Sequence, residues 1–202
     1  MKLVLASNNA HKLEELRAIL HYLGMEVISQ REAGVFLEPV EDGQSFEENS
    51  YIKAKTIMDA CGLPTIADDS GLMVDALQGE PGIHSARYGG EACKSDRDRL
   101  EYLLQRMEAV AEENRNARFV SVITMLTPDG KKIVARGECP GLILRKPEGE
   151  NGFGYDPVFY VPEEGCTFAQ LSAGQKNKIS HRARALQAFT EIVRKEREYA
   201  DK

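Results

Sequence analysis

The stretch Thr65-Ile66-Ala67-Asp68-Asp69-Ser70-Gly71 places two adjacent carboxylates at the end of a short apolar run. The run from Leu63 to Ala67 predicts a strand, and Ser70-Gly71 predicts a turn that breaks the strand directly after the carboxylates. Adjacent residues of a strand point to opposite faces, so Asp68 and Asp69 share one target only where the strand is broken. In α/β proteins ligands bind at the carboxyl ends of strands, and neighbouring carboxylates suit Mg²⁺. The alternative is an Asx-type turn, in which both side chains bond to local backbone.

The composition is that of a globular protein with a substantial core. The chain has 202 residues, of which 42% are hydrophobic and 29% are charged, and we expect a single domain over residues 1–202. The net charge of −6 argues against polymeric nucleic acid as a partner, because such partners require a basic face. A site for a mononucleotide needs only a local group of cations and is not excluded.

Two features of the sequence bear on cellular location. No apolar run approaches the roughly 18 residues that a membrane span needs, and residues 1–6 are too short for the core of a signal peptide. The cysteines form no CxxC pair, which argues against a structural zinc site or a redox motif; they are Cys61, Cys93, Cys139 and Cys166. Free thiols fit a reducing cytoplasm, so we expect a cytoplasmic protein without a membrane partner.

The order of the expected elements predicts an α/β fold with a mixed sheet. Apolar residues recur at helical spacing over residues 13–23, 46–61, 100–110 and 185–193. Strand patterns cover residues 2–6, 63–67, 118–127, 132–136 and 142–144. The turn signal Pro128-Asp129-Gly130 joins two of these strands into an antiparallel hairpin. Helices interleaved with strands, followed by a hairpin, are typical of an α/β protein with flanking helices.

The loop Ser7-Asn8-Asn9-Ala10-His11-Lys12 connects the first strand to the first helix. Backbone N–H groups at a helix N-terminus, together with the positive end of the helix dipole, can hold a phosphate. Lys12 adds a cation in the first turn. The alternative is an ordinary N-cap formed by Ser7, Asn8 or Asn9.

An acidic loop precedes the second helix. Ser45 and Glu48 match a capping box, so Glu48 is expected to serve the helix end. Glu41, which lies earlier in the loop, is freer to reach a metal ion. Lys53 follows Asn49 by one helical turn, and its alternative role is that of a solvated surface lysine.

The loop around Gly152-Phe153-Gly154-Tyr155-Asp156 is rich in glycine and aromatic residues. The glycines flanking Phe153 let an aromatic ring stand exposed while the backbone approaches a ligand closely. Such a ring beside a carboxylate can stack on a nucleobase, which contributes roughly 1–3 kcal/mol per base. The alternative is an aromatic anchor that fills the core beneath the loop.

Ser180-His181-Arg182 opens the last helix, with Ser180 as the expected N-cap. Cations in the first turn oppose the helix dipole and cost about 0.3–1 kcal/mol. A ligand with hydrogen-bond acceptors would explain their position.

These stretches together resemble the inosine triphosphate pyrophosphatase family, the house-cleaning dITP/XTP pyrophosphatases. The resemblance covers nearly the whole chain and rests on blocks that occur in this order: Ser7-Asn8-x-x-x-Lys12, Phe46-x-Glu48-Asn49-x-x-x-Lys53-Ala54, Asp68-Asp69-Ser70-Gly71-Leu72, Pro81-Gly82-x-x-Ser85-Ala86-Arg87-Tyr88, Phe153-Gly154-Tyr155-Asp156-Pro157 and Ser180-His181-Arg182.

The resemblance implies both an activity and an architecture. Members hydrolyse nucleoside triphosphates, preferring the deaminated purines ITP, dITP and XTP, to the monophosphate and pyrophosphate with Mg²⁺ as cofactor. It implies an elongated α/β structure with a long mixed sheet, two lobes around a substrate cleft, and usually a homodimer. A Maf-like pyrophosphatase acting on pyrimidine or modified nucleotides and a nucleotide-binding regulator without catalysis are the alternatives.

Roles for individual residues follow from the same resemblance. Asp69 would accept a proton and bind the metal, with Glu41 or Asp68 as a further metal ligand. Residues 7–12, from Ser7 to Lys12, would hold the triphosphate with Lys53, and Ser70 would contact substrate. The nucleoside pocket would comprise Phe153, Gly154, Tyr155, Asp156, Lys176, His181 and Arg182.

Overall fold

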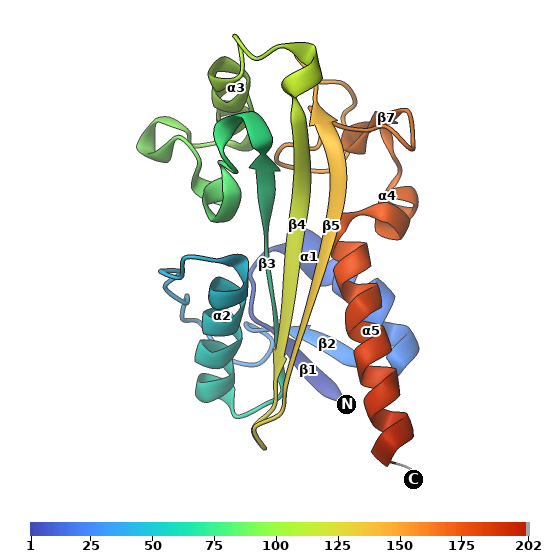
Figure 1. The fold of residues 1–202 in the computed structure, drawn as a ribbon. Helices are drawn as coiled ribbons and strands as arrows, with labels where there is room; N and C mark the ends of the chain where they lie inside the picture. Colours follow the sequence, from blue (N-terminus) through green and yellow to red (C-terminus); the bar gives the residue numbers. More distant parts are fainter. Residues whose placement is uncertain (201–202) are drawn as a thin grey trace. The chain divides into compact units, whose positions relative to one another are not determined.

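The computed structural model describes residues 1–200, with side chains through residue 198 (Figure 1). The strands are β1 Lys2–Leu5, β2 Glu26–Ser29, β3 Thr65–Val74, β4 Asn116–Leu126, β5 Lys132–Ile143, β6 Phe159–Val161 and β7 Cys166–Thr167. The α-helices are α1 Ala10–Leu20, α2 Phe46–Cys61, α3 Asp96–Arg106, α4 Ala173–Ile179 and α5 His181–Ala200. Short 3₁₀ helices cover His21–Leu23, Asp75–Leu77, Gly82–Arg87, Gly90–Ala92, Glu112–Asn114 and Phe168–Gln170.

The strands form one mixed seven-stranded sheet in the order β2-β1-β3-β4-β5-β6-β7. β1 pairs in parallel with β2, from Lys2 opposite Glu26 to Leu5 opposite Ser29, and in parallel with β3. β6 runs antiparallel to both β5 and β7. A tight turn, closed by a bond from Thr127 N to Lys131 O, joins β4 and β5 as a hairpin. The expectation of an α/β fold with a mixed sheet and flanking helices is confirmed.

The chain divides into two compact units, and the long strands β3, β4 and β5 contribute residues to both. Unit 1 comprises Met1–Asp69, Ser121–Gly137 and the chain from Arg182 onward. Unit 2 comprises Ser70–Val120 and Glu138–His181.

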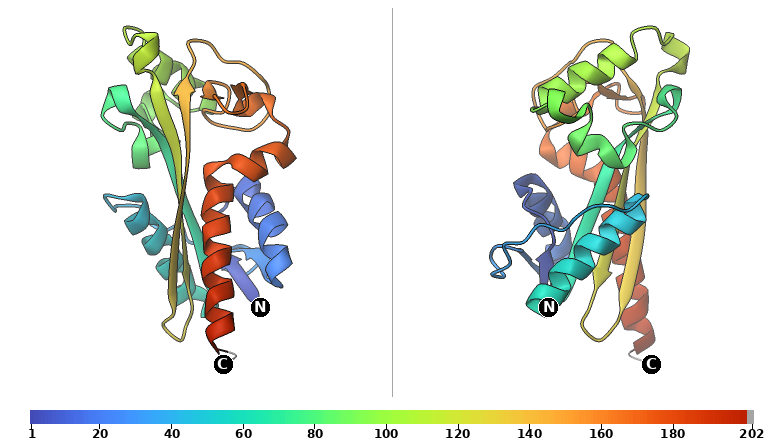
Figure 2. Two further views of the ribbon diagram at one scale, coloured as in Figure 1. Left: turned by 45° about the vertical axis from the view of Figure 1, so that its right-hand side comes forward. Right: turned by 90° about the vertical axis from the view of Figure 1, so that its left-hand side faces the viewer.

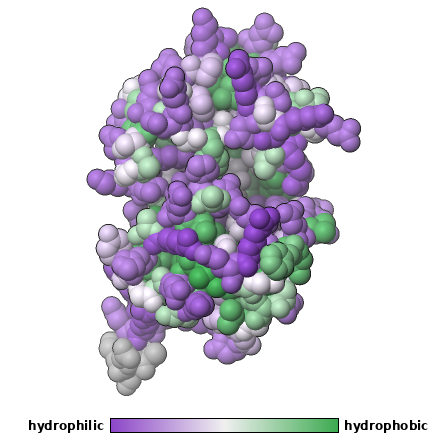
Figure 3. All heavy atoms as spheres, turned by 180° about the vertical axis from the view of Figure 1, so that it is seen from behind, coloured by the Kyte–Doolittle hydropathy of each residue, from purple (hydrophilic) through white to green (hydrophobic). Residues whose placement is uncertain are grey.

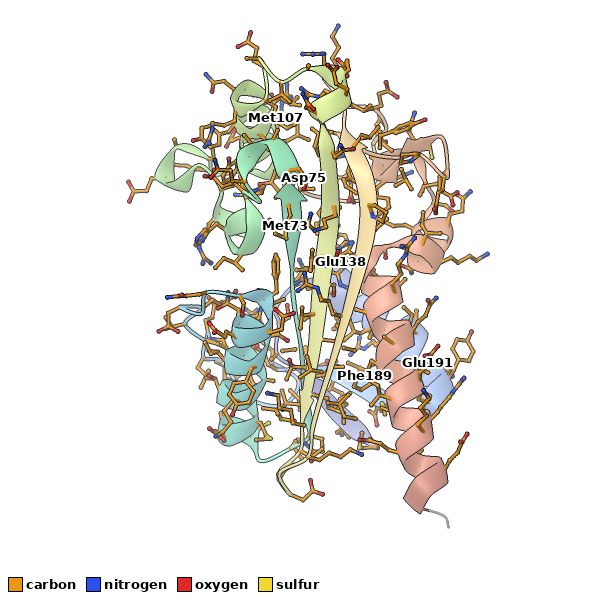
Figure 4. The ribbon with its side chains drawn as sticks, viewed as in Figure 1. Met73, Asp75, Met107, Glu138, Phe189 and Glu191 are labelled. Atoms are coloured by element: carbon orange, nitrogen blue, oxygen red, sulfur yellow. The ribbon has the colours of Figure 1, made fainter. Side chains whose placement is uncertain are left out.

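Unit 1 has helices on both faces of its strands. Alternation along β1 sends Leu3 and Leu5 into a core with α1 and α5, while Val4 lies in a second core with α2. Figure 2 shows α1 and α5 on one side of these strands and α2 on the other. On α5, the buried Phe189 faces the strands and the exposed Glu191 lies on the opposite side of the helix (Figure 4). Both faces of β3 are therefore covered within this unit.

Unit 2 is built around aromatic side chains. The rings of Phe119 and Phe159 pack edge to face with centroids 4.7 Å apart, and Phe168 stacks on Phe119 at 5.8 Å. Leu100, Leu103 and other apolar residues of the α3 region close the same core. This core lies directly beneath the loop that carries Phe153 and Asp156.

The surface is mixed in character. Figure 3 shows one face on which hydrophobic side chains interrupt a mostly hydrophilic covering. Among the residues of unit 1 whose side chains are described, Tyr22, Phe36 and Val40 are large apolar residues that are more than 70% exposed, at 83%, 79% and 75%. No helix within residues 1–200 is both long and apolar enough to cross a membrane.

Three expectations about local structure were wrong. β3 does not break at Ser70-Gly71 but continues to Val74 beside the long strand β4, past Thr65 and Ile66, where it pairs with β1. Residues 142 and 143 are the end of β5 and not a separate strand. The short helix α4 was not expected, although its capping box, Ser172 with Gln175, is visible in the sequence.

Candidate active site

Asp68 and Asp69 point to opposite faces of β3, because the strand is continuous through both residues. Asp68 contacts Lys12 of α1 and Arg182 of α5. Asp69 contacts Lys53 of α2. The two adjacent carboxylates of the sequence therefore belong to two separate clusters of unit 1.

Asp68 is a buried carboxylate bound by two cations and a hydroxyl. Its Oδ2 lies 3.0 Å from Lys12 Nζ and accepts a bond from Arg182 Nε at 2.9 Å. Its Oδ1 accepts a bond of 2.7 Å from Ser121 Oγ on β4. Burial alone would raise the pKa of Asp68, but Arg182 and Lys12 outweigh it and hold that pKa well below its usual range. Asp68 is therefore a permanently ionised anchor.

Arg182 is buried at the start of α5, where the helix dipole disfavours a cation. Glu15 of α1 lies 2.5 Å from its Nη1, and Asp68 accepts from its Nε. Burial lowers the pKa of Arg182, but these two carboxylates more than compensate and raise it above the usual value. The sequence argument needed a ligand to explain this cation, whereas two carboxylates of the chain already pair with it.

Lys12 links the first loop to β3. Besides its ion pair, its Nζ donates to the backbone oxygen of Asp68 at 3.1 Å. Burial lowers the pKa of Lys12, against the attraction of Asp68. The helix start is capped by Asn9, whose Oδ1 accepts from Lys12 N, and Ser7 Oγ accepts from Asn9 N. The N-cap alternative is thus observed, with Asn9 as the cap. The N-terminus of α1 also carries the Lys12 ammonium.

The rest of the first loop is open to solvent. Ala10 and His11 are exposed in the first turn of α1. Asn8 is exposed as well, and its Nδ2 donates to Glu38 Oε1 at 3.2 Å. Exposed residues at a helix N-terminus lie where an anion can approach the helix dipole from solvent.

Asp69, Lys53 and Glu41 form the second cluster. Lys53 Nζ lies 2.5 Å from Asp69 Oδ1 and 3.5 Å from Glu41 Oε2, so a buried ammonium bridges two carboxylates. The other oxygen of Asp69, Oδ2, is buried and has no hydrogen-bond partner among residues 1–200. Burial raises the pKa of Asp69, against the attraction of Lys53.

This cluster fits a divalent cation better than the Asp68 cluster does. A buried carboxylate oxygen without a hydrogen bond is costly, and a hard cation is a natural partner for it. Glu41 supplies a second carboxylate beside the Lys53 ammonium. The presence of that ammonium shows that the cluster accommodates a positive charge. Within the described part of the chain, no three His, Cys, Asp or Glu side chains gather as a metal site. Asp69 and Glu41 are thus a pair that leaves coordination positions for water or substrate oxygens.

Unit 2 presents a separate group of predicted site residues. Asp156 is buried, and its Oδ2 accepts bonds from Lys176 Nζ at 2.5 Å and from Phe153 N at 3.0 Å. Lys176 Nζ lies 4.8 Å from the centre of the Phe153 ring. A Cβ at Gly152 would come within 2.0 Å of Asp156 Oδ2, so this glycine is required for the close approach. The carboxylate, the ammonium and the ring hold one another in place.

For the aromatic residues of this loop the sequence left two roles open, a core anchor and an exposed stacking platform. Tyr155 and Phe153 differ in which of these roles they fit. Tyr155 is buried and donates from its hydroxyl to Ser85 O at 2.9 Å, so it anchors the loop. Phe153 is partly exposed, as a stacking platform requires. Gly154 N donates to Asp96 Oδ2 at 2.9 Å, which ties the loop to α3.

Two further predicted residues lie in unit 2. His181 is buried, and its ring stacks on Phe119 with centroids 4.7 Å apart and planes inclined by 15°. Ser70 is partly exposed on β3. The side chain of His181 therefore packs in the aromatic core of unit 2 and does not face solvent.

Sequence reasoning missed Glu15 and Ser121. Glu15 follows Lys12 by three residues on α1, so both lie on one helix face, which is the one signal that could have found it. Ser121 and Thr124 are both buried hydroxyl residues of β4, and such a hydroxyl carries no distinctive pattern. Glu15 pairs with Arg182, and Ser121 donates to Asp68.

Comparison with known proteins decides the family. The sequence profile described as the Ham1 family matches residues 3–192. This chain belongs to the Ham1 family. The resemblance inferred from the six sequence blocks is thereby confirmed.

Relatives of this Ham1-family chain are similar over almost their full length. The dITP/XTP pyrophosphatase of Thermus thermophilus is 48% identical over 194 residues, covering 96% of this chain and 92% of the relative. That of Haemophilus influenzae is 49% identical over 187 residues, covering 92% and 95%.

Solved structures agree in fold. The Ham1 protein of Staphylococcus aureus superposes with a TM-score of 0.87 at 43% identity, covering 97% of this chain and 100% of that one. The HAM1 protein of Coxiella burnetii has a TM-score of 0.88 at 39% identity, covering 96% and 99%.

Proposed function

We propose that this chain is a nucleoside triphosphate pyrophosphatase that hydrolyses dITP, XTP and ITP to the monophosphate and pyrophosphate, and so cleanses the nucleotide pool. The observation that carries the proposal is the Asp69–Lys53–Glu41 cluster with its unpaired carboxylate oxygen. The relatives that bear the name dITP/XTP pyrophosphatase support the reaction class and the choice of substrates.

Asp69 and Glu41 are the residues that we propose to hold a divalent metal, and Mg²⁺ is the metal that carboxylates and phosphate oxygens favour. When bound, it supplies charge neutralisation on the triphosphate and helps to orient the attacking water. The ion pair of Lys53 with both carboxylates keeps their charges together in the folded chain.

Asp69 is the proposed proton acceptor. Its Oδ2 makes no hydrogen bond within the described residues, so that oxygen is available to a water proton. Burial, which raises the pKa of Asp69, makes the carboxylate a stronger base than an exposed aspartate. Lys53 stabilises the negative charge that moves through the cluster.

The triphosphate is the proposed ligand of residues 7–12. The exposed backbone at the N-terminus of α1 offers N–H groups to phosphate oxygens. Lys12 adds a fixed cation, because its Nζ is held by the carboxylate and the carbonyl oxygen of Asp68. We therefore propose Asp68 as the group that positions Lys12 and Arg182, and not as a metal ligand.

The base is the proposed ligand of the aromatic loop. Phe153 offers a partly exposed ring that Lys176 and Asp156 hold in place. From the sequence resemblance we also propose His181 and Arg182 as donors to the base, and Arg182 suits the O6/N7 edge of a 6-keto purine. GTP shares that edge, so we propose that the pocket lacks an acceptor for its 2-amino group. Similar kcat/KM values for GTP and ITP would contradict this last point.

The test of the proposed function is pyrophosphate release from ITP, XTP, dITP, GTP, ATP and dTTP, each with Mg²⁺ and with EDTA. We expect Mg²⁺-dependent turnover of ITP, dITP and XTP and little of ATP or dTTP. Nucleotide binding without turnover would instead make the chain a regulator, and preferential turnover of dTTP would indicate Maf-like specificity.

Two expectations remain predictions, namely the homodimer implied by the resemblance and the cytoplasmic location inferred from the free thiols. Light scattering coupled to size-exclusion chromatography tests the first, with about twice the mass of 22.5 kDa expected. Fractionation of the source cells tests the second.

A further inference from the structure

Asn49 of α2 is a buried polar side chain that the proposed chemistry leaves unexplained. It is 0% exposed and lies one helical turn before Lys53. Its Oδ1 accepts a hydrogen bond of 2.9 Å from the backbone nitrogen of Gly43. Its Nδ2 is buried without a hydrogen-bond partner in the part of the chain that the structure describes.

The chemistry of Gly43 fixes the orientation of this amide. A backbone N–H can only donate, so the oxygen of Asn49 must face the loop and the nitrogen must face away from it. The unpaired donor is therefore a consequence of the bond that the oxygen makes.

Stability does not account for an asparagine at this position. A buried donor without a partner destabilises the folded state, whereas an apolar side chain of similar shape carries no such cost. The contact between Asn49 and Gly43 must then serve something other than the packing of α2.

Gly43 is closely fitted against α2. A Cβ there would lie 2.7 Å from Asn49 Oδ1 and 2.8 Å from Glu48 Cβ. The loop can therefore approach the helix only with glycine at this position. Gly43 follows Glu41 by two residues, so its contact with Asn49 also limits where Glu41 can go.

We propose that Asn49 is a positioning residue that binds the acidic loop at Gly43 and thereby holds the Glu41 carboxylate opposite Asp69. Two carboxylates meet at Lys53, whose Nζ lies 3.5 Å from Glu41 Oε2 and 2.5 Å from Asp69 Oδ1. The proposal rests on the proposed function, because it assigns Glu41 and Asp69 to one divalent cation.

The experiment measures Mn²⁺ binding to the nucleotide-free protein by electron paramagnetic resonance, alongside thermal unfolding. Asn49→Leu removes the acceptor for Gly43 and should raise the Kd for Mn²⁺ about 10-fold or more, the usual effect of losing a residue that orients a metal ligand. Its Tm should change little, because losing the bond to Gly43 is offset by removing the unpaired donor. Asn49→Asp keeps an acceptor oxygen and should retain Mn²⁺ binding.

Ser50→Ala is the matched control. Ser50 lies on the same helix and is equally buried. It donates to Ala67 O of β3 at 3.3 Å and not to the acidic loop. It should lower the Tm while leaving the Kd for Mn²⁺ within twofold. A purely structural role for Asn49 predicts the same pattern for Asn49→Leu, and that result would overturn the proposal.

Gly43→Ala provides a second route if Asn49→Leu fails to fold. It leaves Asn49 in place and forces the loop away, so it should weaken Mn²⁺ binding as Asn49→Leu does. Combining either change with Glu41→Gln should add little beyond Glu41→Gln alone, because both act through the same carboxylate. Fully additive effects, or equal losses in Asn49→Leu and Asn49→Asp, would contradict the positioning role.

Failure of this inference is distinguishable from failure of the proposed function. If Glu41→Gln itself leaves the Kd for Mn²⁺ unchanged, the positioning role falls, while Mg²⁺-dependent hydrolysis of ITP by the unaltered protein still supports the proposed reaction. If the unaltered protein releases no pyrophosphate, the proposed reaction falls.

Discussion

The two faces of β3 treat adjacent carboxylates in opposite ways. On the face toward α1 and α5, Asp68 accepts bonds from Ser121 and Arg182 and pairs with Lys12. On the face toward α2, Asp69 pairs with Lys53 through one oxygen, and its other oxygen has no hydrogen-bond partner within residues 1–200. Neighbours in sequence are thus a carboxylate with partners on both oxygens and a carboxylate with one unpaired oxygen.

This difference indicates which of the two carboxylates is suited to act as a base. The surroundings of Asp68 hold its pKa well below the usual range, so it is a poor base and a stable structural ion. Burial raises the pKa of Asp69 and leaves an oxygen available. Substitutions on the two faces should therefore separate stability from activity.

Asp69→Asn should give the largest effect on turnover. Removing the proton acceptor should reduce kcat for ITP by about 10²–10⁴-fold, the range typical of general-base catalysis. Folding should be retained, since Asn is similar in shape and Glu41 remains beside Lys53 as a charged partner. Steady-state pyrophosphate release with circular dichroism as a folding check measures both. Asp59→Asn, an exposed aspartate of the same unit, is the control and should be silent.

Asp68→Asn should give the largest effect on stability. It leaves the buried Arg182 and Lys12 with an uncharged partner, and breaking a buried ion pair in this way costs roughly 3–5 kcal/mol. Urea unfolding measures the change in the free energy of unfolding. A loss smaller than 1 kcal/mol, with kcat reduced as in Asp69→Asn, would reverse the roles assigned to the two residues.

The pH dependence of stability should differ between the same two variants. The pKa of Asp68 is depressed in the folded protein, so its contribution is present above about pH 3.9 and is lost as the pH falls from there toward the folded pKa. The pKa of Asp69 is raised, so its ionisation disfavours folding at neutral pH and no longer does so below about pH 3.9. Relative to the unaltered protein, Asp68→Asn should thus become less destabilised as the pH falls below about 3.9. Asp69→Asn should lose its gain in stability as the pH falls toward the same value. Urea midpoints between pH 3 and 8 would show both trends, and parallel curves for the two variants would contradict them.

Glu15→Gln should give the smallest effect. It weakens one of two carboxylate contacts of Arg182 but leaves Asp68 in place. We expect a several-fold rise in KM for ITP with kcat nearly unchanged, on the order of 1 kcal/mol. Glu14→Gln, an exposed neighbour on α1, is the matched control. A KM equal to that of the control would show that Asp68 alone orients Arg182.

Much of this architecture could be predicted from local sequence. The spacing of Leu13, Leu16 and Leu20 gave α1, and Ser45 marked the start of α2. The ordered motif blocks gave the family before any geometry was known. These signals lie in short stretches of the chain or recur at regular spacing. A single sequence is therefore sufficient to predict these helices and the family.

The division of labour between Asp68 and Asp69 could not be predicted in this way. Ser70-Gly71 is a turn signal on its own, whereas in the structure it lies inside β3, which is a neighbour of the long strand β4 in the sheet. Glu15, Ser121 and Asn49 likewise acquire their roles through contacts with residues far away in sequence or through a buried, unpaired atom. Such effects follow from tertiary structure and leave no local pattern.

The most direct test is a crystal structure of the protein soaked with Mn²⁺, read from its anomalous diffraction. The account predicts a peak in direct coordination with Asp69, with Glu41 beside it and with Asp68 still bound to Lys12 and Arg182. A peak coordinated by Asp68 and Asp69 together would contradict it, since the continuous strand places these carboxylates on opposite faces.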